Sequence, residues 1–177
     1  MASYYSSITD EQAELIRSAP LFFVATADPN LATGPNGIGP VNLSPKGGVL
    51  LHILSPNRVA FLDYMGRGNE TARHGLAGGP ITVMICSFEA ENAAIVRLYG
   101  KVRITPLADS PIADILLQHT PKEPKGPARQ VIEVEVEKTI TSCGYGVPVM
   151  AFVRNRQMGD RGRRYKGGSA SRTRARV

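Results

Sequence analysis

A dense group of hydrogen-bond donors lies in the segment DYMGRGNETARH, residues 63–74, directly after the strand-like run RVAFL. The segment holds two glycines together with Arg67, Asn69, Thr71 and Arg73. A turn that leads into a helix start exposes backbone N–H groups, which bind phosphate well, and arginine adds charge-assisted hydrogen bonds. We therefore interpret the segment as a candidate anion site. The alternative is a short helix that Asn69 or Thr71 caps, with both arginines in solvent.

The common phosphate-binding motifs do not account for this segment. No Gly-Lys-Ser/Thr follows at the P-loop spacing, and a dinucleotide fingerprint would need a third glycine and a downstream acid. A second polar group lies in VNLSPKGG, residues 41–48, where Asn42 and Ser44 share one strand face and Lys46 follows a proline. A polar face on an apolar strand requires a polar partner. The alternative is a hairpin in which Pro45, Gly47 and Gly48 make the turn and Lys46 lies in solvent.

A third group is the stripe Arg97, Tyr99, Lys101 and Arg103 on one face of the strand-like run IVRLYGKVRI. Such a stripe is a solvated face, the wall of an anionic pocket or an interface. No catalytic arrangement accompanies these groups: the histidines are scattered, no carboxylates are paired, and no serine or cysteine lies in a nucleophile context. Anion-binding elements without an acid, base or nucleophile indicate that a bound cofactor supplies the chemistry.

The elements that must position these residues are mostly short strands. The runs with strand character are 21–27, 39–43, 48–54, 58–63, 81–88, 93–105 and 128–138. A capping box of Thr9 and Gln12 predicts a first helix, and two further short helices are expected near 69–77 and 110–119. Strands with such short connections exclude a parallel α/β sheet. The sequence therefore predicts a mainly β (α+β) fold, an antiparallel barrel of six to seven strands with short flanking helices.

The net charge of +6 belongs to one end of the chain. Residues 154–177 hold nine Lys/Arg and one acid, whereas residues 1–153 hold twelve basic and fourteen acidic residues. The basic end is rich in Gly, Ser and Arg, so we expect a disordered tail that follows a single domain of residues 1–153. The tail would bind polyanions weakly, and no specific nucleic-acid site is expected.

Compartment and membrane association are inferred from further features of the sequence. No apolar run approaches the roughly 20 residues that span a bilayer, and the N-terminal residues are polar where a signal peptide is apolar. Cys86 and Cys143 have neither metal-binding nor redox spacing. A cytoplasmic protein without membrane attachment is therefore expected.

The motifs VNLSPKG, GNET and CGYGVP occur in this order, among the runs FFVATA, ITVMICSFE and RLYGKVRI. Over about residues 8–153 the chain resembles the pyridoxamine 5′-phosphate oxidase-like flavoprotein superfamily. The resemblance implies an FMN-binding split β-barrel that acts as a homodimer, with flavin in a cleft between the subunits. It also implies a set of basic and polar residues that bind the cofactor and its phosphate, which carries over here to Ser44, Lys46, Arg67, Asn69, Thr71, Arg73 and Arg97.

Two hypotheses of function follow from the resemblance. The first is an FMN-dependent oxidoreductase that acts on an unknown small molecule. The second is a non-catalytic protein of the same fold that stores or senses flavin or haem. The chain does not match the C-terminal substrate-binding pattern of true pyridoxine phosphate oxidases, so vitamin B6 oxidation is not the expected activity. It also departs from the family pattern at Arg67, which replaces a serine and adds a positive charge.

Overall fold

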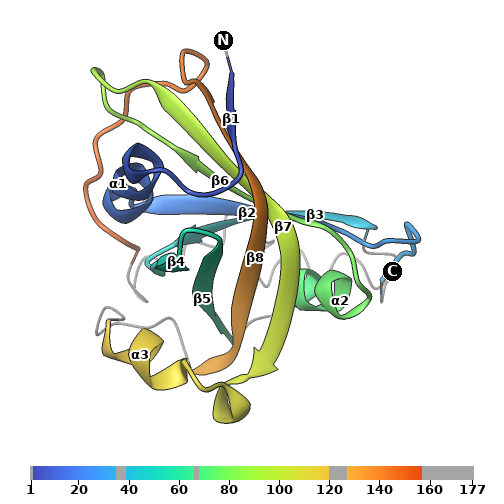
Figure 1. Ribbon diagram of the computed structural model, residues 1–177. Coiled ribbons are helices and arrows are strands. Elements are labelled where there is room, and N and C mark those ends of the chain that lie inside the picture. The colour runs from blue at the N-terminus through green and yellow to red at the C-terminus, as the bar shows by residue number, and fades with distance from the viewer. Residues whose placement is uncertain (1, 35–38, 66–67, 120–126, 157–177) are drawn as a thin grey trace, which may run out of the picture.

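The computed structural model describes residues 2–34, 39–65, 68–119 and 127–156. Its centre is one antiparallel sheet of eight strands that curls into a split barrel (Figure 1). The hydrogen-bonded order is β3-β2-β6-β7-β8-β5-β4, and β1 pairs with β8 outside this path. The strands are Ser3–Tyr5 (β1), Leu21–Ala27 (β2), Val41–Gly47 (β3), His52–Ser55 (β4), Arg58–Tyr64 (β5), Ile81–Cys86 (β6), Ala94–Pro106 (β7) and Ala128–Cys143 (β8).

This architecture confirms the predicted antiparallel barrel. Each of the seven strand-like runs overlaps one of β2 to β8, because apolar residues that recur in these runs must be buried on at least one face of a sheet. The additional strand is β1, whose three residues are all exposed and pair with residues 139–141 of β8. A three-residue exposed strand carries no hydrophobic pattern, so its pairing depends on the partner strand alone.

The α-helices of the described residues flank the sheet. They are α1 (Asp10–Ser18), α2 (Glu70–Leu76) and α3 (Ala113–Gln118), and a 3-10 turn, η2 (Leu107–Asp109), precedes α3. The predicted capping box at α1 is present: the Thr9 hydroxyl accepts the Gln12 N–H, and the Gln12 side chain accepts the Thr9 N–H. Helix α2 packs against β2 and β7 (Figure 1). Residues at its start and at the end of β5 line one pocket.

The barrel interior is one continuous apolar core. Phe22 on β2 and Phe61 on β5 are both buried and meet edge to face, with ring centroids 5.3 Å apart. A smaller cluster on the other face of β5 consists of Ala60, Leu62, Leu116 and Val131. Because β5 is thus buried on both faces, its last residues, Asp63 and Tyr64, carry polar groups into surroundings with little water.

A histidine pair links β4 to the end of α3. The rings of His52 and His119 lie edge to face with centroids 6.2 Å apart. Burial lowers the pKa of His52 below its ordinary value of 6.5, and the nearby His119 lowers this pKa further. The unfolded chain therefore takes up a proton at His52 more readily than the folded chain. Stability contributed by the neutral imidazole is present above about pH 6.5 and is lost as the pH falls through the lowered pKa.

We expect the thermal unfolding temperature to fall as the pH is lowered from about 7.5 to about 5, and to fall less in the variant His52→Gln. The glutamine cannot take up the proton that the unfolded state of the wild type binds. Unfolding followed by circular dichroism at several pH values measures this difference. The matched variant His119→Gln removes only the weaker of the two influences on the pKa of His52. Its unfolding temperature should therefore depend on pH almost as strongly as that of the wild type. If the unfolding temperature falls equally with pH in His52→Gln and in the wild type, His52 does not contribute to the pH dependence of stability.

Candidate functional site

Strand β3 presents a polar face made by Asn42, Ser44 and Lys46, which alternates with an exposed apolar face. The strand lies at one edge of the sheet, where a proline is tolerated because one row of N–H groups has no strand partner. It therefore continues through Pro45 and Lys46 to Gly47. The alternative is wrong in giving Pro45 to the turn and placing Lys46 in solvent, whereas its glycine Gly48 does follow the end of the strand. The chain leaves the strand at Gly48, whose positive φ of 70° suits glycine. All three polar side chains consequently share one face.

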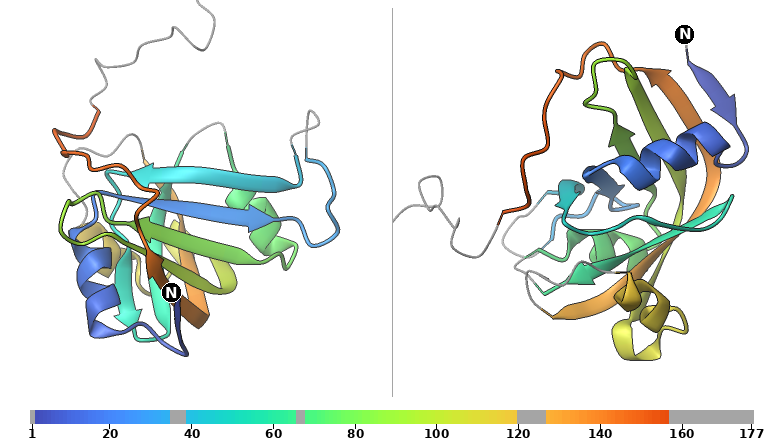
Figure 2. Two further views of the ribbon diagram at one scale, coloured as in Figure 1. Left: turned by 90° about the horizontal axis from the view of Figure 1, so that it is seen from above. Right: turned by 90° about the vertical axis from the view of Figure 1, so that its left-hand side faces the viewer.

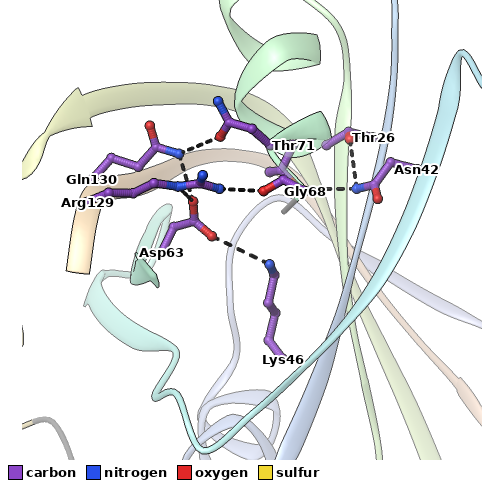
Figure 3. A network of polar contacts seen from close by, with 9 residues as sticks. Thr26, Asn42, Lys46, Asp63, Gly68, Thr71, Arg129 and Gln130 are labelled. Atoms are coloured by element: carbon purple, nitrogen blue, oxygen red, sulfur yellow. Dashed lines mark hydrogen bonds and ion pairs between the residues drawn. The ribbon is translucent and has the colours of Figure 1, made fainter. Parts of the chain in front are cut away.

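A pocket of about 250 Å³ opens beside this face. It is bounded by β3, the end of β5, the start of α2 and the start of β8, and side chains from these elements converge there in Figure 3. The lining residues are Asn42, Ser44, Lys46, Asp63, Tyr64, Gly68, Asn69, Glu70, Thr71 and Arg129. Almost every one of them carries a polar or charged side chain. The pocket therefore suits a polar group of a ligand rather than an apolar one.

Asp63 is the centre of the ionic network in this pocket (Figure 3). Its Oδ1 lies 3.7 Å from Lys46 Nζ, and its Oδ2 accepts hydrogen bonds from Arg129 Nε at 2.8 Å and Gln130 Nε2 at 2.7 Å. Arg129 also donates from Nη2 to the carbonyl oxygen of Gly68 at 2.7 Å. The side chains of Lys46, Asp63 and Arg129 are 20, 11 and 19% exposed, so water screens their charges only in part.

One hydroxyl group in the pocket wall has no hydrogen-bond partner among the described residues. It is Ser44 Oγ on β3, and the oxygen atom is buried. Leaving a buried polar group unpaired costs about 1–3 kcal/mol, so such a group in a folded protein requires an explanation. A ligand with several acceptor oxygens would satisfy this hydroxyl and would also meet Lys46 Nζ on the same strand face. These donors fit a phosphate group.

A chain of hydrogen bonds runs behind the pocket from β3 to α2. Asn42 Nδ2 donates to Thr71 Oγ1 at 3.1 Å and to Thr26 Oγ1 at 3.3 Å. His74 is fully buried, with Nδ1 2.9 Å from Thr26 Oγ1 and Nε2 2.8 Å from Arg73 Nη2. Because a guanidinium only donates, His74 Nε2 accepts, and Nδ1 carries the proton donated to Thr26. The imidazole therefore orients Thr26, and Thr26 helps to hold the pocket residue Asn42.

Arg73 holds the loop that follows β2 and does not line the pocket. Its Nη1 lies 3.5 Å from Asp28 Oδ2, and its guanidinium donates to the carbonyl oxygens of Ala32 and Gly39 at 3.5 Å. The backbone N–H of Ala32 lowers the pKa of Asp28, and the N–H of Asn30 and the charge of Arg73 add to this effect. Asp28 is thus a stable carboxylate partner, and Arg73 ties the loop to α2.

Four residues carried over from the family resemblance lie together in the pocket: Ser44, Lys46, Asn69 and Thr71. Asn69 does not cap α2 through its side chain; its Oδ1 accepts from Gln130 Nε2 at 3.0 Å. Arg97 lies elsewhere and donates to Ser142 Oγ at 3.0 Å. Arg67 lies outside the described residues, as does the predicted tail from residue 157 onward. Among the described residues, the structure therefore separates Arg73 and Arg97 from the four residues that line the pocket.

Sequence reasoning did not single out Asp63, Tyr64, Glu70 and Arg129 as site residues. Asp63 lies opposite Gln130 in the β5–β8 pairing, which brings Arg129 to the end of β5. Strand register of this kind depends on long-range pairing and cannot be read from one isolated segment. The only available signal was the polar group ARQ directly before the valine-rich part of β8.

A larger hollow of about 550 Å³ lies over β5, β7 and β8, and Lys101 and Arg103 of the basic stripe line it. The charges there pair across neighbouring strands: Arg58 bonds to the buried Glu133, and Lys101 Nζ lies 3.0 Å from Glu137 Oε1. This self-paired arrangement is typical of a charged strand surface. It offers no unpaired polar atom of the kind found beside β3.

Two further properties concern the part of the chain that the structure describes. None of its helices has the length and apolar character needed to cross a membrane. Within the same residues, no group of three or more His, Cys, Asp or Glu side chains could hold a metal ion.

Fold and site together define the class of protein: an antiparallel split barrel with a polar, cation-containing pocket at the end of β5. Residues 8–143 match the family model described as pyridoxamine 5′-phosphate oxidase. The chain belongs to the pyridoxamine 5′-phosphate oxidase family. This finding confirms the resemblance inferred from the VNLSPKG, GNET and CGYGVP motifs.

The chain is similar to the pyridoxamine 5′-phosphate oxidase family protein ustO of Aspergillus flavus, with 35% identity over 152 residues. The match covers 85% of this chain but only 57% of that relative, so the chain spans little more than half of the relative's length. Among solved structures, HupZ of Group A Streptococcus has a TM-score of 0.54 at 20% identity and covers 75% of this chain and 91% of its own. An FMN-binding protein of Syntrophomonas wolfei has a TM-score of 0.53 at 13% identity, with 80% and 84% covered. These two structures support the fold.

Proposed function

We propose that the chain binds FMN and holds the phosphate in the pocket beside β3. The observation that carries the proposal is the buried hydroxyl Ser44 Oγ, which has no partner among the described residues and lies in a pocket that Lys46 and Arg129 also line. A hydroxyl donor and two cations suit the acceptor oxygens and negative charge of a phosphate. Membership of the family supports a flavin as the ligand, as does the FMN-binding protein among the structures of this fold.

The side chains have separate roles in this proposal. Lys46 supplies a charge, Ser44 supplies a hydroxyl donor, and Asn42 orients Thr71 at the start of α2. Arg73 acts indirectly, because it holds the loop after β2. For Arg67 and Arg97 we retain the cofactor contacts that the family resemblance implies. In this proposal Arg97 contacts the cofactor that is bound by the partner subunit. When bound, FMN supplies hydride and electron transfer, and the protein contributes binding and orientation. We infer an FMN-dependent oxidoreductase that acts on a small molecule other than vitamin B6.

The size of the pocket supports a homodimer. A volume of about 250 Å³ is below the roughly 300–1,000 Å³ of pockets that enclose a whole organic ligand, so the pocket accommodates the phosphate end, and the flavin ring needs further surface. Exposed apolar residues are available for a second copy of the chain: Val41 and Leu43 on β3, and Tyr145, Val149, Phe152 and Val153 in the extended segment after β8 (Figure 2). Apolar exposure of this extent is typical of interaction surfaces.

The proposal is tested with the purified full chain and added FMN. The complex should be yellow, its flavin absorption should bleach under a chemical reductant and return in air, and light scattering should give the mass of a dimer. A protein that takes up no FMN would overturn the proposal. Bound flavin that no nicotinamide or candidate substrate reduces would favour a storage or sensing role. A red protein with a strong Soret band would indicate haem instead.

A further inference from the structure

The pocket beside β3 contains carboxylates as well as cations. Lys46 and Arg129 bring two positive charges, and Asp63 and Glu70 bring two negative charges, so these four lining side chains sum to zero. The two carboxylates differ in their contacts. Asp63 pairs with both cations, whereas none of the ion pairs found among the described residues involves Glu70. A phosphate group that entered the pocket would therefore find both cations already paired with Asp63.

The contacts of Asp63 show that this carboxylate would compete with a bound phosphate for the two cations. Its two oxygens face Lys46 and Arg129 from one side of the pocket, and Gln130 adds a hydrogen bond to Oδ2 (Figure 3). A phosphate bound to the same cations would lie close to a carboxylate that is only 11% exposed. Like charges at such separations repel more strongly where water screens them poorly. Phosphate binding is therefore weaker than the two cations alone would give.

We propose that Asp63 is an internal counter-ion that competes with the ligand phosphate for Lys46 and Arg129 and so limits the preference of the site for FMN over riboflavin. The inference rests on the proposed function, since it assigns a specificity-determining residue to the same pocket. The carboxylate also holds the two cations in place while no phosphate is bound, because half-buried cations without partners are costly. Asp63 thus stabilises the free protein at the expense of phosphate affinity.

The variant Asp63→Asn keeps the shape of the side chain and removes its charge. We expect FMN to bind about tenfold more tightly, which corresponds to about 1.4 kcal/mol, while riboflavin affinity stays within about twofold of the wild type. The thermal unfolding temperature of the ligand-free variant should fall, because Lys46 and Arg129 lose their partner. Both affinities are measured by titrating the protein into each flavin and following flavin fluorescence. Asp63→Ser, which keeps one acceptor oxygen, carries the same expectation if the Asn variant does not fold.

Glu70→Gln is the matched control, because it removes a carboxylate from the same pocket without freeing a paired cation. It should change FMN affinity much less than Asp63→Asn. Equal gains in both variants would show that the overall charge of the pocket, and not competition by Asp63, sets the affinity, and would overturn the inference. Unchanged or weaker FMN binding in Asp63→Asn would also overturn it while leaving the proposed function intact. If the wild type binds neither flavin, the proposed function fails and the inference fails with it.

Discussion

Replacing Lys46 by methionine should weaken FMN binding by about ten- to a hundredfold and leave riboflavin binding nearly unchanged. The methionine retains an apolar stem of similar length, which matters because Lys46 Nζ lies 6.0 Å from the centre of the buried Phe61 ring. The variant then loses the positive charge, and with it the charge-assisted contact to the phosphate and the ion pair with Asp63. Fluorescence titration with both flavins measures the two affinities under identical conditions.

Lys101→Met is the control for this prediction, because the Lys101 side chain is 78% exposed and lies over the other hollow. It should leave both affinities unchanged. Arg73→Ala should differ from both variants: it loosens the loop after β2, so any loss should be similar for FMN and riboflavin. A loss in Lys46→Met that is equal for the two flavins would show that Lys46 does not face the phosphate.

Replacing His74 by alanine should lower the free energy of unfolding by about 2–4 kcal/mol. The side chain is fully buried, so its removal leaves a cavity and takes a hydrogen-bond partner from both Thr26 and Arg73. For a domain of this size the unfolding temperature should fall by about 5–15 °C. Thermal or urea unfolding followed by circular dichroism measures the change.

The exposed His119 provides the comparison for His74. Its Nδ1 hydrogen-bonds to the carbonyl oxygen of Ile115 at 2.8 Å, a contact within one helical turn, and the side chain is exposed, so His119→Ala should cost far less stability. The His74 variant should also bind FMN more weakly, since Thr26 no longer holds Asn42 in place. A His74→Ala protein as stable as the wild type would contradict the role of this hydrogen-bonded chain in supporting the pocket.

Much of the fold could be predicted because each signal is local. The capping box of Thr9 and Gln12 needs only residues three apart, and the apolar runs of β2 to β8 reflect burial that each strand requires wherever it lies in the sheet. Strand β1 could not be predicted, because Ser3–Tyr5 is exposed and depends on β8 for its pairing. Hydrophobic periodicity indicates which residues of a strand are buried, but it does not indicate which other strand it pairs with.

The candidate site shows the same division. Ser44 and Lys46 could be found because their spacing along one strand puts them on one face. The placement of the arginines could not be predicted, since Arg73 is drawn to Asp28 on one side of α2 and Arg129 reaches the pocket only through the register of β5 and β8. In the sequence, all arginines of the segment 63–74 were equal candidates for the phosphate site, because they carry the same charge. Tertiary pairing places Arg129 in the pocket and Arg73 outside it.

Strand β8 pairs with β1, β5 and β7, and it is the last strand in chain order. During synthesis the hairpins β2–β3, β4–β5 and β6–β7 can each form as soon as they leave the ribosome, but none of them can close the barrel. Closure waits for residues 128–143, so the apolar faces of β5 and β7 stay unprotected until then. We expect a nascent chain stopped before β8 to depend on chaperones, and the complete chain to become resistant to protease in one late step.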